Sequence, residues 1–268
     1  MLPTPDTAHV SFDTVYEPSE DSYLFLDTLS SPSESSWLSH RFSPSTSTST
    51  STPSPLIVEV GTGSGVVLGF VAANSEQIFG RRDILALGTD VNRNACAATR
   101  ETAQRAIQDR QGTTTDNGTS ATSTFLAPIM ADLGAPLRQG SVDVLLFNPP
   151  YVPTEELPQI PSATTEQAME GMSRSEKFDH ESYLLSLTYA GGKDGMETTD
   201  RLLDAIPGLL HPGRGVAYVL LCRQNRPDEV RDRIVAWGGG WCAESVGSSG
   251  KQAGWEKLII LRIWRELP

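Results

Sequence analysis

The sequence predicts an α/β fold built on a mostly parallel, doubly wound sheet. Short apolar segments rich in β-branched residues alternate along the chain with longer segments of helical spacing. Several apolar segments stop directly at polar or glycine residues, as buried parallel strands do at the carboxyl edge of a sheet. We expect strands at 56–60, 84–90, 125–129, 142–147, 215–221 and 258–264. We expect helices at 19–29, 66–71, 92–108, 196–210 and 228–236.

The length of 268 residues and the hydrophobic fraction of 38% fit one domain with insertions. We expect residues 1–14, which are polar and aperiodic, to form a flexible tail, and 15–268 to form a single domain. Three segments near 31–55, 112–124 and 155–182 have little to bury, and we interpret them as polar insertions. The third one follows a predicted strand end, so we expect it to lie over the cleft there as a lid.

The composition disfavours several classes of function. With 33 acidic and 21 basic residues the formal net charge is −12, which repels a nucleic-acid backbone. Cys96, Cys222 and Cys242 lie far apart in a chain with four histidines, so we expect neither a disulfide framework nor a metal site. Reduced thiols indicate a cytoplasmic protein, with the nucleus as a second location. No apolar segment approaches the roughly 18 residues of a membrane span, and the first residues lack a secretory pattern.

The turn after the first predicted strand has a nucleotide-binding pattern. Gly61, Gly63 and Gly65 follow the strand, and an apolar helix begins at Val66. A dinucleotide-binding turn needs a glycine in place of Val66, so a ligand without a pyrophosphate fits better. We expect S-adenosylmethionine, with its amino-acid end on the glycine backbone and its ammonium group near Glu59. The alternative is a tight strand-to-helix turn that binds no ligand.

Carboxylates follow the next two predicted strands. Asp90 ends the strand at 84–90, where a Rossmann-like sheet places its acceptor for ribose hydroxyls. Asp132 follows the strand at 125–129, and its carboxylate can accept a hydrogen bond from an adenine amino group while Leu133 contacts the ring. The alternative for Asp132 is an ordinary loop acid.

The tetrapeptide 148–151 ends another apolar strand abruptly. Pro149 and Pro150 fix the backbone, so the Asn148 side-chain oxygen and the Pro149 carbonyl can aim into one cleft. Two such acceptors suit a planar NH2 group, whose poorly nucleophilic nitrogen they would orient toward an electrophile. Tyr151 could stack on the flat face of that group. The alternative is a simple strand-ending turn.

Four motifs together resemble one enzyme family. They are Val-Tyr-Glu-Pro-Ser-Glu-Asp-Ser, Glu-Val-Gly-Thr-Gly-Ser-Gly, Thr-Asp-Val-Asn and Phe-Asn-Pro-Pro-Tyr, at 15–22, 59–65, 89–92 and 147–151. The chain from 15 to 264 is similar to class I S-adenosylmethionine-dependent methyltransferases of the eukaryotic HemK-like glutamine methyltransferase group. The resemblance implies a Rossmann-like, seven-stranded, mostly parallel sheet with helices on both faces. It also implies N5-methylation of the glutamine in the Gly-Gly-Gln motif of the class I translation release factor, by the catalytic subunit of a heterodimer.

The resemblance also implies residue roles and a partner. The tetrapeptide 148–151 would present the target amide, and the implied cofactor contacts are Ser22, Glu59, Gly61, Asp90, Asp132, Leu133 and Asn148. The implied partner is a small zinc-binding activator protein that pairs with the edge strand between Phe125 and Ile129, so zinc would belong to the partner. Two alternatives stay open: a protein-lysine or adenine N6 methyltransferase, and a scaffold that binds the cofactor without catalysis.

Overall fold

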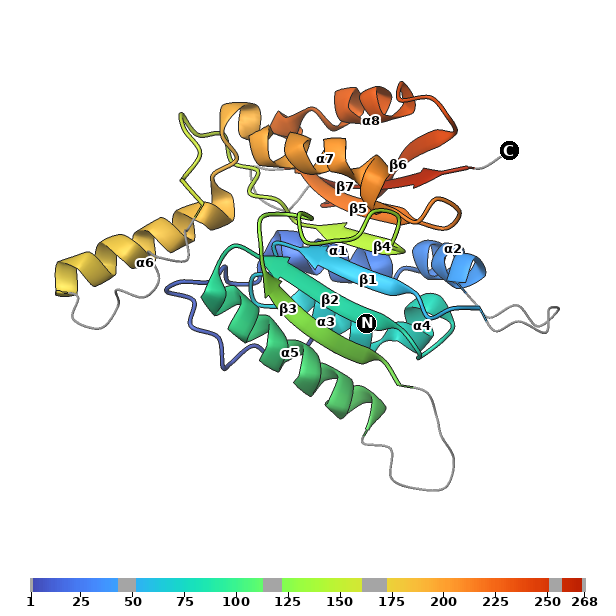
Figure 1. The fold of residues 1–268 in the computed structure, drawn as a ribbon, viewed down its shortest axis with the longest axis horizontal. Helices are drawn as coiled ribbons and strands as arrows, with labels where there is room; N and C mark the ends of the chain where they lie inside the picture. The colour runs from blue at the N-terminus through green and yellow to red at the C-terminus, as the bar shows by residue number, and fades with distance from the viewer. Residues whose placement is uncertain (1, 43–51, 113–121, 161–172, 251–256, 267–268) are drawn as a thin grey trace.

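The computed structural model describes residues 2–42, 52–112, 122–160, 173–250 and 257–266. Within these ranges seven strands form one sheet, in the order β3-β2-β1-β4-β5-β7-β6 (Figure 1). Strands β1 to β5 are parallel, and β7 is antiparallel to both β5 and β6. The predicted seven-stranded, mostly parallel sheet is confirmed. The strands are β1 Leu56–Val60, β2 Leu85–Asp90, β3 Thr124–Met130, β4 Val144–Phe147, β5 Val216–Cys222, β6 Trp241–Ser248 and β7 Leu258–Arg265.

Helices cover both faces of the sheet (Figure 1). One buried apolar cluster joins α1, α2 and α3 to one face, and a second joins α7 and α8 to the other. In the part of the chain that the structure describes, no helix is long and apolar enough to cross a membrane. The helices are α1 Glu20–Leu29, α2 Pro32–Phe42, α3 Val66–Ala73, α4 Ser75–Phe79, α5 Arg93–Gln111, α6 Arg174–Tyr189, α7 Glu197–Leu209 and α8 Pro227–Val235, with 3-10 turns η2 Lys193–Gly195 and η3 Arg223–Asn225.

Strand β6 is the one strand whose place the sequence did not predict. Among the described residues, β6 lies at one end of the sheet and pairs with β7 alone. Its residues are all partly or fully exposed. A strand of this kind has no buried apolar run, which is the signal that identifies the other six.

The segment before α1 packs against α5, whereas a flexible tail was expected at 1–14. Val10 is buried against Ala95 and Ala98 of α5. The Asn92 Nδ2 donates to the Thr14 carbonyl oxygen at 2.7 Å. The receiving face of α5 consists of small alanine side chains, which leave room for Val10 but give little hydrophobic signal in the sequence.

The expected polar insertion near 31–55 contains the helix α2. The side chains of Leu38 and Phe42 are buried in the core. Glu34 is also buried, and its Oε1 accepts a hydrogen bond from the Arg262 Nη1 at 2.7 Å. Serines fill much of the rest of α2, so its apolar stripe is too narrow to stand out in the sequence.

The other two predicted insertions are described in part. In the segment near 155–182, helix α6 begins after a capping box in which Ser173 and Glu176 each accept from the other's backbone N–H. The segment near 112–124 ends in β3. The remaining parts of the three predicted insertions, 43–51, 113–121 and 161–172, lie outside the described residues.

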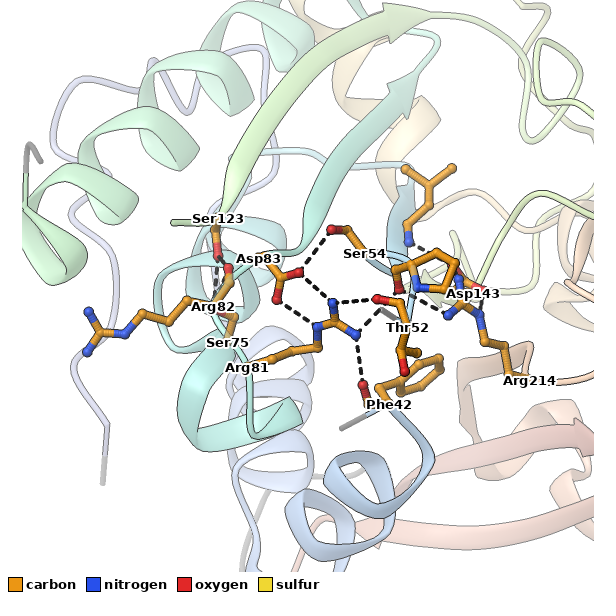
Figure 2. A network of polar contacts seen from close by, with 12 residues as sticks. Phe42, Thr52, Ser54, Ser75, Arg81, Arg82, Asp83, Ser123, Asp143 and Arg214 are labelled. Atoms are coloured by element: carbon orange, nitrogen blue, oxygen red, sulfur yellow. Dashed lines mark hydrogen bonds and ion pairs between the residues drawn. The ribbon is translucent and has the colours of Figure 1, made fainter. Parts of the chain in front are cut away.

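A buried arginine fastens the loops at the amino edge of the parallel strands (Figure 2). The Arg81 guanidinium donates to the carbonyl oxygens of Phe42 (3.0 Å) and Thr52 (3.2 Å). Its Nε donates to Asp83 Oδ1 at 2.8 Å. These contacts hold the end of α2 and the approach to β1 against the turn before β2.

A buried carboxylate has the same role on the other side of β1 (Figure 2). Asp143 Oδ2 accepts from the Leu56 backbone N–H at 2.9 Å, and Asp143 Oδ1 accepts from the Arg214 Nε at 2.7 Å. Arg214 Nη1 also donates to the Pro53 carbonyl oxygen at 3.1 Å. Asp143 therefore joins the starts of β1, β4 and β5.

Replacing Asp143 tests this anchoring. Asp143→Ala should lower the free energy of unfolding by about 2–4 kcal/mol, because it leaves a partly buried guanidinium and a strand N–H without their acceptor. Urea denaturation monitored by circular dichroism measures the change. Asp232→Ala is the control, since Asp232 pairs with Arg231 at the surface, and it should leave stability close to wild type. Equal effects from the two substitutions would contradict the anchoring role.

Candidate active site

A cavity opens at the carboxyl ends of the parallel strands, where β1 and β4 lie side by side and the chain connections leave in opposite directions. Including its open mouth, it contains about 1190 Å³ of empty space. Its walls come from segments far apart in the sequence: the start of α1, the ends of β1, β2, β3 and β4, and parts of α6 and α7. The predicted site residues that line it are Ser22, Glu59, Gly61, Gly63, Asp90, Asp132, Leu133, Asn148, Pro149 and Pro150.

The three glycines of the turn after β1 have different surroundings: two line the cavity and one lies in the protein interior. Gly61 and Gly63 line the cavity with φ angles of +67° and +51°, which favour glycine. Gly65 also has a positive φ, but it does not line the cavity. A Cβ at Gly65 would lie 2.6 Å from the Thr99 Cα, so this glycine lets α3 approach α5. Gly65 therefore has a packing role, and its predicted cofactor contact stays a prediction.

Two buried carboxylates lie behind the glycine turn. Glu59 Oε2 accepts from the Leu68 backbone N–H at 3.0 Å. Asp90 Oδ2 accepts from the Gly63 N–H at 3.0 Å, and its Oδ1 accepts from the Asn92 N–H at 2.8 Å. Burial raises the pKa of Glu59 well above its usual value, and burial also raises the pKa of Asp90. A cationic or hydroxyl-bearing ligand in the cavity would relieve that cost.

The start of α1 brings a third acid that sequence reasoning missed. Asp21 is buried and lines the cavity beside the predicted Ser22. The Tyr16 hydroxyl donates to Asp21 Oδ2 at 2.9 Å, and the Ser22 backbone N–H donates to Asp21 Oδ1 at 2.6 Å. Asp21 stands in the first turn of a helix, where an acid is common on the surface, so its burial could not be predicted from the sequence.

The end of β3 supplies a further ion pair at the cavity wall. Asp132 Oδ2 pairs with the Arg201 guanidinium of α7, and both residues line the cavity. Leu133 follows with a φ of +49°, which is uncommon for a non-glycine residue. Arg201 was also missed, because it lies in a helix far along the chain and outside any motif.

The tetrapeptide 148–151 places its first three residues at the cavity. Within the described residues, no group donates to the Asn148 Oδ1, although this oxygen is buried. Tyr151 does not line the cavity, and its side chain packs against the apolar core instead. The stacking of Tyr151 on a target amide stays a prediction.

Residues of the third predicted insertion and of the chain just after it line the cavity. They are Leu157, Pro158 and Ile160 within the insertion, and Leu184, Leu187 and Thr188 after it. The last three lie in α6, which extends outward from the end of the sheet (Figure 1). The cover over the polar strand ends is thus largely apolar.

Comparison with known proteins identifies the family, although no protein-family model matches the chain. The chain is 30% identical over 267 residues to the protein named Methyltransferase HEMK2 from Mus musculus, covering 97% of this chain and 96% of that protein. It is also 30% identical over 270 residues to the eRF1 methyltransferase catalytic subunit mtq2 of Schizosaccharomyces pombe, covering 99% and 96%. The chain belongs to the HEMK2/Mtq2 methyltransferase family.

A solved HEMK2/Mtq2-family structure agrees with this fold. It is the Mtq2-Trm112 complex of E. cuniculi, matched at 23% identity with a TM-score of 0.50 over 94% of this chain and 99% of that chain. The likeness shows a shared fold. Methyltransferase activity and the Rossmann-like architecture expected from the sequence are therefore confirmed.

The pH dependence of stability tests the burial of Glu59. Because burial raises its pKa above the usual 4.5, the stability of the unliganded protein falls as the pH rises through the raised value. Glu59→Gln keeps an oxygen acceptor for the Leu68 N–H and cannot ionise. The variant should therefore gain stability relative to wild type, and the gain should grow with pH.

Urea denaturation of both proteins at several pH values measures this difference. Glu101→Gln, at a partly exposed position on α5 where Glu101 pairs with Arg105, controls for the general loss of one carboxylate. A difference between Glu59→Gln and wild type that stays constant with pH would show that Glu59 does not ionise from a raised pKa.

Proposed function

We propose that this methyltransferase transfers a methyl group from S-adenosylmethionine to the side-chain nitrogen of glutamine in the Gly-Gly-Gln motif of the release factor eRF1. The relative from S. pombe is named for eRF1 and for a catalytic subunit. A more distant relative from Moorella thermoacetica, 31% identical over 155 residues, is named Release factor glutamine methyltransferase. The observation that carries the proposal is the buried Asn148 Oδ1, which no described group pairs. That oxygen suits the NH2 of a carboxamide.

The cavity residues fit the proposed cofactor. Gly61 and Gly63 have no side chains, so the amino-acid end of S-adenosylmethionine would lie directly against their backbone. The buried carboxylate of Glu59 would face the ammonium group of that end. Each carboxylate oxygen of Asp90 accepts one hydrogen bond from a backbone N–H. Each oxygen can accept a second one, from a ribose hydroxyl. Asp132 would accept from the adenine amino group. When bound, S-adenosylmethionine supplies an electrophilic methyl group on a positively charged sulfur.

The acceptor motif, residues 148–151, would orient the target nitrogen. An amide nitrogen is a poor nucleophile because its lone pair is delocalised, so placement matters more than proton removal. The Asn148 Oδ1 and the Pro149 carbonyl oxygen would accept the two amide hydrogens and hold the nitrogen toward the methyl group. The methylated nitrogen would then lose one proton to water. No dedicated general base is needed for this sequence.

Asn148→Ala tests the role of the acceptor motif. The variant should lower kcat at least about 100-fold because the target amide loses its orienting acceptor. Its affinity for S-adenosylhomocysteine, measured by isothermal titration calorimetry, should stay within several-fold of wild type. Asn94→Ala, at a surface position on α5, is the matched control and should keep wild-type kcat. Full activity of Asn148→Ala would rule out the acceptor role.

Mass spectrometry of eRF1 incubated with the enzyme, its activator and S-adenosylmethionine distinguishes the possible functions. One added methyl group on the glutamine of the Gly-Gly-Gln motif supports the proposal. A methyl group found on lysine or adenine instead would indicate one of the other acceptors. Cofactor binding without methylation of any of these would indicate a scaffold.

The proposed partner is a zinc-binding activator of the Trm112 type, paired with the outer edge of β3. The E. cuniculi Mtq2 structure is a complex with Trm112. Here β3 is the terminal strand of the sheet, and among the described residues no strand pairs with its outer edge. Leu126 and Met130 are each 48% exposed on this strand. A free edge with exposed apolar side chains supports addition of a partner strand.

Charged substitutions on β3 test this interface. The double variant Leu126→Asp, Met130→Asp should weaken binding of the Trm112-type activator at least about tenfold, because charges replace apolar contact area. Isothermal titration with the purified activator measures the change. Val235→Asp on α8, where Val235 is 51% exposed, is the control and should bind normally. Equal affinity of the double variant and wild type would place the interface elsewhere.

We also propose a cytoplasmic location, with the nucleus as a second one. Cys96, Cys222 and Cys242 are all free thiols, and the first two are buried. Free thiols are typical of reducing compartments, which supports this location. Cell fractionation with an antibody to the chain tests it.

A further inference from the structure

Asn225 joins the acceptor motif to two other segments. It lies in η3 directly after β5, and 2% of its surface is exposed. Its Nδ2 donates to the carbonyl oxygens of Tyr151 (3.2 Å), Asp194 (3.0 Å) and Gly195 (3.3 Å). Its Oδ1 accepts from the Cys222 backbone N–H at 2.8 Å. One buried carboxamide thus connects the end of β5, the turn η2 and the acceptor motif.

Two glycines allow the segment around η2 to approach the acceptor motif closely. A Cβ at Gly191 would lie 2.5 Å from the Pro150 carbonyl oxygen, and a Cβ at Gly195 would overlap the Tyr151 carbonyl oxygen. The Gly191 N–H also donates to the Val152 carbonyl oxygen at 2.8 Å. Backbone therefore packs directly on backbone here, without a side chain between them.

The residues around Asn225 are also held in uncommon conformations. Asp194 and Arg226 have φ angles of +56° and +52°, although neither is a glycine. Strained residues of this kind persist where the surrounding contacts fix them, and they gather near functional sites. The hydrogen bond from the Asn225 Nδ2 to the Asp194 carbonyl oxygen is one such contact.

This cluster lies on the side of Asn148 away from the proposed cofactor residues. Glu59 lies in β1, Asp90 ends β2 and Asp132 follows β3, while Asn225 follows β5. The sheet order places β4, and hence Asn148, between the two groups. Asn225 can therefore affect the acceptor motif without touching the cofactor site.

We propose that Asn225 is a positioning residue for the target amide, an inference that rests on the proposed function. By holding the backbone at Tyr151, it fixes the acceptor motif so that Asn148 and Pro149 keep their oxygens in place. Removal of the Asn225 carboxamide removes these four hydrogen bonds from a buried site, which costs free energy. The motif can then shift, and a displacement of about 1 Å lowers a rate by up to about 100-fold.

The test compares Asn225→Ala with Asn74→Ala. Asn74 is also buried, and its Nδ2 donates to the Phe70 carbonyl oxygen at 2.9 Å, at the end of α3. Asn225→Ala should lower kcat for eRF1 methylation at least about tenfold, with the Kd for S-adenosylhomocysteine unchanged within about threefold. Asn74→Ala should lower the melting temperature to a similar extent and keep a kcat near wild type.

Asn225→Asp provides a second readout and keeps the question testable if Asn225→Ala does not fold. The aspartate retains an acceptor for the Cys222 N–H but turns a carboxylate oxygen toward three carbonyl oxygens. A protonated carboxyl group regains one donor. The ratio of the Asn225→Asp kcat to the wild-type kcat should therefore rise as the pH is lowered.

Two results would overturn the assignment of Asn225: equal losses of kcat in Asn225→Ala and Asn74→Ala, or a ratio for Asn225→Asp that does not change with pH. Failure of the proposed function gives a different result. In that case the wild-type enzyme itself leaves the glutamine of eRF1 unmodified, before any variant is compared.

Discussion

Two carboxylates lie buried together at the carboxyl edge of the sheet, Glu59 in β1 and Asp90 at the end of β2. Burial raises the pKa of both, and the charge of Asp90 raises the pKa of Glu59 further. Backbone N–H groups of Gly63, Leu68 and Asn92 oppose this cost by donating to the carboxylate oxygens. The Gly63 N–H belongs to the glycine turn with its positive φ angles, the Leu68 N–H to the first turn of α3 directly after it, and the Asn92 N–H to the turn between β2 and α5. The backbone conformation of these turns therefore stabilises the buried carboxylates, and the carboxylates in turn hold the turns in place.

The two edges of the sheet satisfy their polar groups differently. At the amino edge, Arg81 and Asp143 find partners within the chain, and their hydrogen bonds fasten the loops that lead into the strands (Figure 2). At the carboxyl edge, the Asn148 Oδ1 is buried without a donor from the described residues. A buried acceptor without a partner costs free energy unless a ligand supplies the hydrogen.

The strand pattern and the identities of most cavity residues could be predicted from the sequence. Short apolar runs indicate buried parallel strands. Glu59 lies within one such run, and Asp90 and Asn148 stand at the ends of two other apolar runs. Local patterns were less informative where small or exposed residues make the contacts. The serine-rich α2 and the exposed β6 both lack a continuous apolar stripe, so neither was located. The alanine face of α5 concealed the packing of the N-terminal segment for the same reason.

The sequence by itself determined that polar residues stand at consecutive strand ends, because the alternation of apolar runs and turns depends only on residues that are neighbours in the chain. Only the tertiary structure decided which of those residues face one cavity. Gly65 and Tyr151 belong to the right motifs, yet they pack against α5 and the core. Arg201 and Asn225 belong to no motif, yet α7 and η3 bring them to the site. Contacts between distant segments depend on how helices pack on the sheet, and no local pattern encodes that packing.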